Sequence, residues 1–88
     1  MTNDRLLMFY EEECDPCVVM ETLVQKIEKE LGVNIDRLEV WGNQENKHLL
    51  EKYAGVSIVP FFYNESTGVR ISGETDFGTL KKWALGAN

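Results

Sequence analysis

Residues 6–17 read L-L-M-F-Y-E-E-E-C-D-P-C, an apolar run that leads through three glutamates to a pair of cysteines. Residues 5–10 form a continuous run rich in strand formers, typical of a central strand covered on both faces. From residue 15 to residue 31, apolar side chains recur at helical spacing. Pro16 suits the first turn of that helix, and Gly32 suits its end. The stretch therefore predicts a strand followed by a helix, with both cysteines at the junction.

The rest of the chain continues the alternation of strands and helices. The pattern predicts a second strand at 38–40, a helix capped by Asn43 and ending at Ala54, a third strand at 58–63 interrupted by Pro60, a turn at 64–68, a strand at 69–72 and a last helix at about 76–85. Alternating strands and helices imply parallel pairing, and the late hairpin adds an antiparallel pair. We expect an α/β protein with a central four-stranded mixed sheet flanked by three helices, forming one domain over residues 1–88. Phe61, Phe62 and Tyr63 are expected to supply the core of the sheet plus one exposed ring, and Trp41 and Trp83 are expected to be packing residues.

Composition and charge limit the classes of partner and the cellular compartment that we expect for this protein. The net charge of −6 disfavours nucleic acid and anionic membrane surfaces, because the chain would repel their phosphates. No stretch is long enough to span a bilayer, and the apolar run near the N-terminus is too short for the core of a signal peptide. We expect a cytoplasmic protein that is a monomer.

The chemistry of the chain is concentrated at Cys14 and Cys17. A spacing of three residues at a helix start places both sulfurs within disulfide reach. Cys14 lies at the open end of the helix, where unpaired N–H groups and the helix dipole favour the thiolate, the nucleophile of disulfide exchange. Cys17, one turn inside, suits the role of resolving cysteine. Two buried structural cysteines remain an alternative, whereas a zinc site would need about two more ligands, and the only histidine, His48, is expected to be solvated.

Acidic residues surround the first cysteine, at positions 11–13 and at Asp15. Their negative charge disfavours the thiolate and opposes the helix dipole, whose contribution is about 0.3–1 kcal/mol. We therefore expect the pKa of the Cys14 thiol to be only moderately low and the dithiol to be rather reducing. An ultraviolet titration of the thiolate tests this expectation.

The strand at 6–10 followed by C-D-P-C, the I-V-P at 58–60, and Gly73 before an amphipathic last helix resemble the thioredoxin superfamily over nearly the whole chain. The resemblance implies a thioredoxin-like fold, a cis peptide bond before Pro60 facing the dithiol, and extended pairing of Val59 with a substrate strand. It also implies disulfide-containing protein substrates, reduced through a mixed disulfide. Electrons would come from an upstream reductase or a low-molecular-weight thiol, with no organic cofactor and no metal.

The motif departs from its family in ways that leave alternatives open. Thioredoxins usually have Trp before the first cysteine and Gly after it. In this chain Glu13 and Asp15 flank Cys14 instead, and Pro16 follows Asp15. Met8 stands where they carry a buried acid, so the base for Cys17 is unassigned. Glutaredoxins often have a lysine where this chain has Glu11. A glutathione-dependent glutaredoxin-like enzyme, a non-catalytic redox-sensing or adaptor module, and an iron–sulfur or zinc carrier formed by a dimer therefore remain alternatives. Residues 72–76 are faintly similar to a glutathione-binding loop, but we favour helix capping there.

Overall fold

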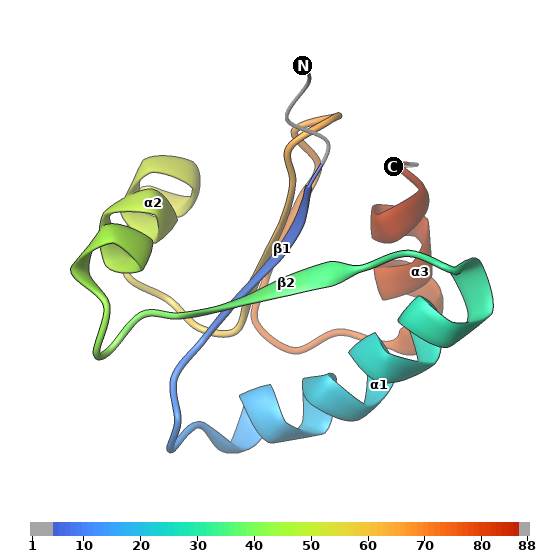
Figure 1. Cartoon of the computed structure of the whole chain (residues 1–88), viewed down its shortest axis with the longest axis horizontal. Coiled ribbons are helices and arrows are strands. Elements are labelled where there is room, and N and C mark those ends of the chain that lie inside the picture. Colours follow the sequence, from blue (N-terminus) through green and yellow to red (C-terminus); the bar gives the residue numbers. More distant parts are fainter. Residues whose placement is uncertain (1–4, 87–88) are drawn as a thin grey trace.

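The elements follow the predicted alternation of strands and helices (Figure 1). The computed structural model describes residues 5–86. The order is β1 (Leu6–Tyr10), α1 (Asp15–Leu31), β2 (Ile35–Glu39), α2 (Gln44–Ala54), β3 (Phe61–Asn64), β4 (Arg70–Ser72) and α3 (Phe77–Leu85). The strands form one sheet in the order β2-β1-β3-β4. Because β1 is parallel to β2 but antiparallel to β3, and β3 is antiparallel to β4, the sheet is mixed, as predicted.

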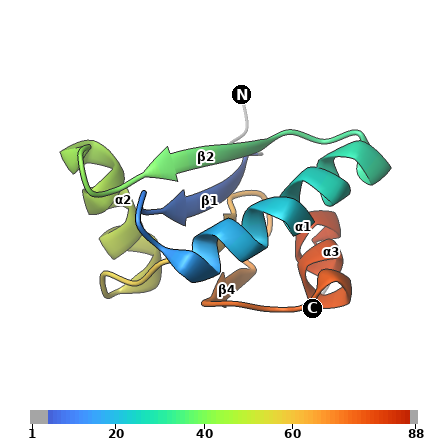
Figure 2. The same ribbon diagram turned by 90° about the horizontal axis from the view of Figure 1, so that it is seen from below.

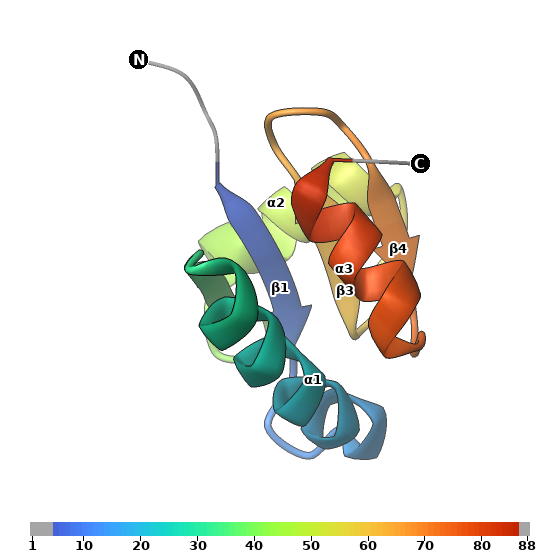
Figure 3. The same cartoon turned by 90° about the vertical axis from the view of Figure 1, so that its right-hand side faces the viewer.

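Helices cover both faces of this sheet (Figures 2 and 3). Helices α1 and α3 lie together on one face, and α2 lies on the other. The alternation of side chains along β1 explains this arrangement: Leu6 and Met8 are buried in the cluster under α1 and α3, whereas Leu7 and Phe9 are buried under α2. Successive side chains of a strand point to opposite faces, so an unbroken apolar run is what a strand covered on both sides requires.

The helix ends are defined by the capping residues that the sequence predicted. Asn43 caps α2 by accepting a hydrogen bond from the N–H of Asn46, and Asp76 caps α3 by accepting one from Thr79. Gly32 ends α1 at a φ of 67°, in the left-handed region where a Cβ would be unfavourable. The capping interpretation of residues 72–76 is therefore confirmed at Asp76.

Two strand boundaries differ from the prediction. Strand β2 covers 35–39 instead of 38–40, because the charged residues Asp36 and Arg37 concealed its first half; both side chains form ion pairs in the structure. Strand β3 begins at Phe61 instead of residue 58, since Pro60 has no N–H to donate to a strand ladder. The predicted strand was therefore wrong over its first three residues.

The aromatic residues follow the prediction in part. Trp83 is 1% exposed and packs edge-on against Phe62, with ring centroids 5.4 Å apart. Phe61 and Phe62 are both buried, on opposite faces of the sheet. The prediction that Trp41 is a packing residue is wrong, because its exposed fraction is 69%.

Candidate redox site

The two cysteines lie at the start of α1, as predicted. Cys14 is the N-cap of the helix, and its sulfur accepts a hydrogen bond from the backbone N–H of Cys17 at 3.2 Å. A disulfide joins the two residues, whose Cα atoms are 5.2 Å apart. The exposed fractions are 8% for Cys14 and 4% for Cys17. The structure therefore shows the oxidised form of the pair.

This disulfide closes a short loop, so it stabilises the fold less than a bridge across a long loop would. In the chain-entropy picture, a bridge between residues three apart stabilises a protein by about 2 kcal/mol, less than a bridge that closes a long loop. The cysteines also share their cluster with a core built from both α1 and α3. A bridge of this kind is suited to opening and closing while the protein stays folded.

Strand register brings Val59 and Pro60 to the edge of the sheet at which β1 ends. Phe9 pairs with Phe61 in antiparallel register, so the residues after β1 and the residues before β3 share that edge. The Val59–Pro60 peptide bond is cis, and the carbonyl of Pro60 accepts a hydrogen bond from Gly73 at 2.7 Å. Within residues 5–86, the backbone N–H of Val59 makes no hydrogen bond to another backbone group. The structure thus places both predicted substrate-binding residues at the same end of the molecule as the dithiol.

The residues that flank the cysteines are exposed. Glu13, Asp15 and Pro16 all lie on the surface, with Pro16 in the first turn of α1. None of the ion pairs formed within residues 5–86 involves Glu13, Asp15 or the two glutamates before them. Their negative charge is therefore not neutralised by a bridging cation of the described chain.

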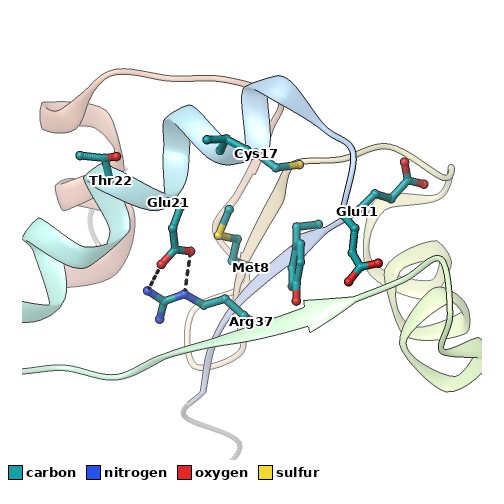
Figure 4. A pocket seen from close by; sticks show the side chains of 9 residues that line it. Met8, Glu11, Cys17, Glu21, Thr22 and Arg37 are labelled. Atoms are coloured by element: carbon teal, nitrogen blue, oxygen red, sulfur yellow. Dashed lines mark hydrogen bonds and ion pairs between the residues drawn. The ribbon is translucent and has the colours of Figure 1, made fainter.

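A pocket of about 370 Å³ opens beside Cys17 (Figure 4). Met8 forms part of its lining, together with Glu21 and Arg37. Sequence reasoning named Met8 but missed the other two. Glu21 could have been found from its spacing, because residues four apart lie on the same side of a helix and Cys17 is four residues earlier. Arg37 could not, since β2 was not recognised at that position.

Comparisons with solved structures identify the fold. A thioredoxin-like protein from Clostridium perfringens superposes with a TM-score of 0.74 at 18% identity, covering 92% of this chain and 68% of that one. Thioredoxin-2, a component of the malaria parasite protein secretion machinery, gives 0.64 at 20% identity, with 91% and 79% covered. Thioredoxin f2 of Chlamydomonas reinhardtii gives 0.62 at 20% identity, with 94% and 80% covered. The chain has a thioredoxin-like fold. No family model matches the sequence, and the search of curated proteins finds no relative.

In this thioredoxin-like chain, Arg37 occupies the sheet position next to Met8. Its guanidinium pairs with the carboxylates of Glu21 and Glu28 on α1. Hydrogen bonds from Arg37 are the main cause of a lowered pKa at both glutamates, although partial burial acts in the opposite direction. The hydrogen bond with Glu21 is the largest cause of a raised pKa at Arg37, and the hydrogen bond with Glu28 adds to it. All three groups are therefore charged at neutral pH, and the triad fastens α1 to β2 beside Cys17.

Replacing Arg37 by methionine is expected to destabilise the protein more at neutral pH than in acid. A carboxylate with a lowered pKa contributes stability above its ordinary value, here 4.5, and loses it as the pH falls through the lowered value. Because these side chains are partly exposed, screening limits the difference to about 1 kcal/mol. Urea unfolding at pH 7 and pH 3 measures it. An equal loss at both pH values would show that Arg37 acts through packing, and Lys81→Met, which breaks the more exposed pair with Glu30, serves as the control.

None of the helices within residues 5–86 combines the length and the hydropathy that a transmembrane span requires. Over the same residues, no group of three or more His, Cys, Asp and Glu side chains is placed to hold a metal ion.

Proposed function

We propose that the chain is a thiol–disulfide oxidoreductase that reduces disulfides of other proteins through Cys14 and Cys17. One observation carries this proposal: a disulfide at the N-terminus of α1, in which the sulfur of Cys14 accepts a hydrogen bond from the backbone N–H of Cys17. The thioredoxin-like fold, which places this pair where a strand runs into a helix, supports it.

The reaction starts from the reduced dithiol. The Cys14 thiolate attacks one sulfur of the client disulfide, a bond forms between the two sulfurs, and the other client sulfur leaves as a thiolate. The Cys17 thiolate then attacks the sulfur of Cys14, which closes the disulfide seen in the structure and releases the second client sulfur. Two electrons and two protons pass to the client in total. A thiol or dithiol reductant must then reduce the Cys14–Cys17 bridge.

Cys14 is the attacking residue because its sulfur lies at the positive end of the α1 dipole. The N–H of Cys17 points at this sulfur, and a hydrogen bond to the charged form of a group favours that form. The unpaired carboxylates around the cysteine act in the opposite direction. We therefore propose a moderately low pKa for the Cys14 thiol and a reducing couple, suited to a cytoplasmic protein.

Cys17 must lose its proton before it can resolve the mixed disulfide. It lines the pocket of about 370 Å³ beside Met8, which offers no base. The volume is several times the roughly 30 Å³ share of one water molecule. We propose that water in this pocket accepts the proton, with the carboxylates of Glu11 and Glu12, which also line it, as further acceptors.

Val59 is proposed to hold the client. Its backbone N–H is free of internal backbone hydrogen bonds, and it lies at the dithiol end of the sheet. An extended client segment could pair with it as an added strand pairs with a sheet edge. This contact would position a client disulfide over Cys14 without any requirement on the client side chains.

The experiment is reduction of insulin by the purified chain, together with its redox potential measured in defined thiol–disulfide buffers. We expect catalytic insulin reduction with dithiothreitol, a two-electron transition, and re-reduction by thioredoxin reductase in preference to glutathione, since the carboxylates near Cys14 repel an anionic tripeptide. Efficient donation by glutathione would favour the glutaredoxin-like alternative. Partner binding without any insulin reduction would favour an adaptor, and metal or colour in the purified protein would favour a carrier.

A further inference from the structure

The sheet topology gathers the negative charge of the chain around the dithiol. Four segments lie at the edge of the sheet where β1, β2 and β4 end and β3 begins, namely 11–17, 39–45, 55–60 and 73–76; we call this surface the dithiol edge. Every charged residue in these segments is an Asp or Glu, and none of the lysines or arginines of the chain belongs to them. The electrostatic potential at the dithiol edge is therefore more negative than the net charge of −6 alone indicates.

Large apolar side chains are exposed at the same end of the molecule. Among the described residues, Trp41, Val56 and Ile58 belong to the dithiol edge, and Val18 and Val19 follow Cys17 in the first turns of α1. Leu85, at the end of α3, is the one large exposed apolar side chain of residues 5–86 that lies elsewhere. Apolar surface that is gathered at one end and bordered by charge is typical of a surface that contacts another protein.

Trp41 is held in its exposed position by its own loop. The Glu39 carboxylate accepts hydrogen bonds from the backbone N–H groups of Trp41 and Gly42, each at 2.8 Å. A recess of about 350 Å³ is lined by Glu12, Glu39, Trp41 and Gly42. Since Glu12 lies on the loop that leads to Cys14, the indole and the carboxylate border one hollow next to the dithiol. An apolar and an anionic contact are thus available side by side.

We propose that the dithiol edge selects client disulfides in which the cystine is flanked by Lys or Arg and by an apolar side chain. The apolar side chain would contact Trp41 and its exposed neighbours, and the cations would face the unpaired carboxylates on the Cys14 side. This inference rests on the proposed function and specifies its substrate class. Charge complementarity of this kind acts mainly on the rate of association, which it can raise by a factor of 10 or more and which salt suppresses.

The test uses two matched peptides, each with one intramolecular disulfide and one leucine, that differ only in whether four flanking residues are Lys or Glu. The rate of reduction by the pre-reduced protein is measured for each peptide by rapid quenching and thiol trapping. Each rate is divided by the rate of the same peptide with dithiothreitol, which removes any difference in intrinsic reactivity. We expect a preference of about tenfold or more for the Lys peptide at about 20 mM salt, falling to about twofold or less at about 0.5 M, where the Debye length is only a few ångströms.

Two variants with the same change in net charge locate the effect. Glu12→Gln combined with Glu13→Gln is expected to reduce the Lys/Glu preference at least about threefold, and any change in Cys14 reactivity cancels in this ratio. Glu30→Lys, at the far end of α1 in an exposed pair with Lys81, is expected to leave the preference unchanged. Trp41→Ala is expected to slow both peptides and to preserve their ratio.

The outcomes separate this inference from the proposed function. Uncharged 2-hydroxyethyl disulfide serves as the common substrate. If it and both peptides are reduced but the peptides show no charge preference, or if Glu30→Lys has the same effect as the double variant, the selection of cationic clients is wrong and the oxidoreductase proposal stands. If the protein reduces none of the three, the oxidoreductase proposal itself fails.

Discussion

Replacing Cys14 by serine is expected to lower insulin reduction to the rate of dithiothreitol alone. The variant lacks the sulfur that attacks the client, and Cys17 lies one turn further inside α1 and is the less exposed of the two cysteines, at 4% against 8%. The variant should still fold, because serine is itself a preferred N-cap residue and Cys14 caps α1. Circular dichroism checks the fold, and the insulin turbidity assay measures the activity.

The control for this result is a change near the site that leaves both sulfurs in place. Val18→Ala alters an exposed side chain directly after Cys17 and should keep catalytic turnover above the background rate. Substantial insulin reduction by folded Cys14→Ser would contradict the assignment of Cys14 as the nucleophile. Attack on the client by Cys17, which lines the pocket beside Met8, would then be the alternative.

Replacing Cys17 by alanine is expected to stop the reaction after its first half. The Cys14 thiolate can still attack, but no second sulfur is present to release the client, so a covalent complex accumulates in a 1:1 ratio. Mass spectrometry of the non-reduced mixture should find the client attached to Cys14, and dithiothreitol should release it. Alanine is preferred over serine as the replacement, because a hydroxyl without a partner at this buried site would cost roughly 1–3 kcal/mol.

The same variant distinguishes a protein-disulfide reductase from a glutathione-dependent enzyme. Chemistry on glutathione mixed disulfides can proceed with one thiol, so full activity of Cys17→Ala in a glutathione-coupled assay would favour the glutaredoxin-like alternative. Cys14→Ser is the matched control, since it should be inactive in both assays. Failure of Cys17→Ala to trap any client, while the wild-type protein reduces insulin, would exclude the mixed-disulfide route.

Much of the fold was predictable because local signals agreed with one another. The limits of α1 followed from Pro16, helical periodicity and Gly32, and the structure has the helix over the predicted range. The caps at Asn43 and Asp76 were also correct. Strand β2 was harder, because its middle carries charged side chains whose ion pairs form only after α1 packs beside it. The partner carboxylates, Glu28 and Glu21, are 9 and 16 residues earlier in the chain and belong to a different element, so the residues of β2 alone do not reveal the pairs.

The candidate site was predictable where its residues are close in sequence. The Cys14–Cys17 bridge follows from their spacing, whereas the arrival of Pro60 at the same edge depends on the register of β1 and β3. The exposure of Trp41 was not predicted, since an aromatic residue at a strand end is expected to pack. Its loop instead folds onto the Glu39 carboxylate, which satisfies two backbone N–H groups and leaves the indole outside.

The two outer strands of the sheet bear on how the protein behaves when concentrated. β4 offers only three residues along its free side, and β2 carries Asp36 and Arg37, both tied into ion pairs. Short or charged outer strands make poor templates for a strand from another molecule. Two copies of this chain are therefore not expected to pair through their outer strands. Concentrated solutions of the protein should resist fibre formation, even during disulfide exchange.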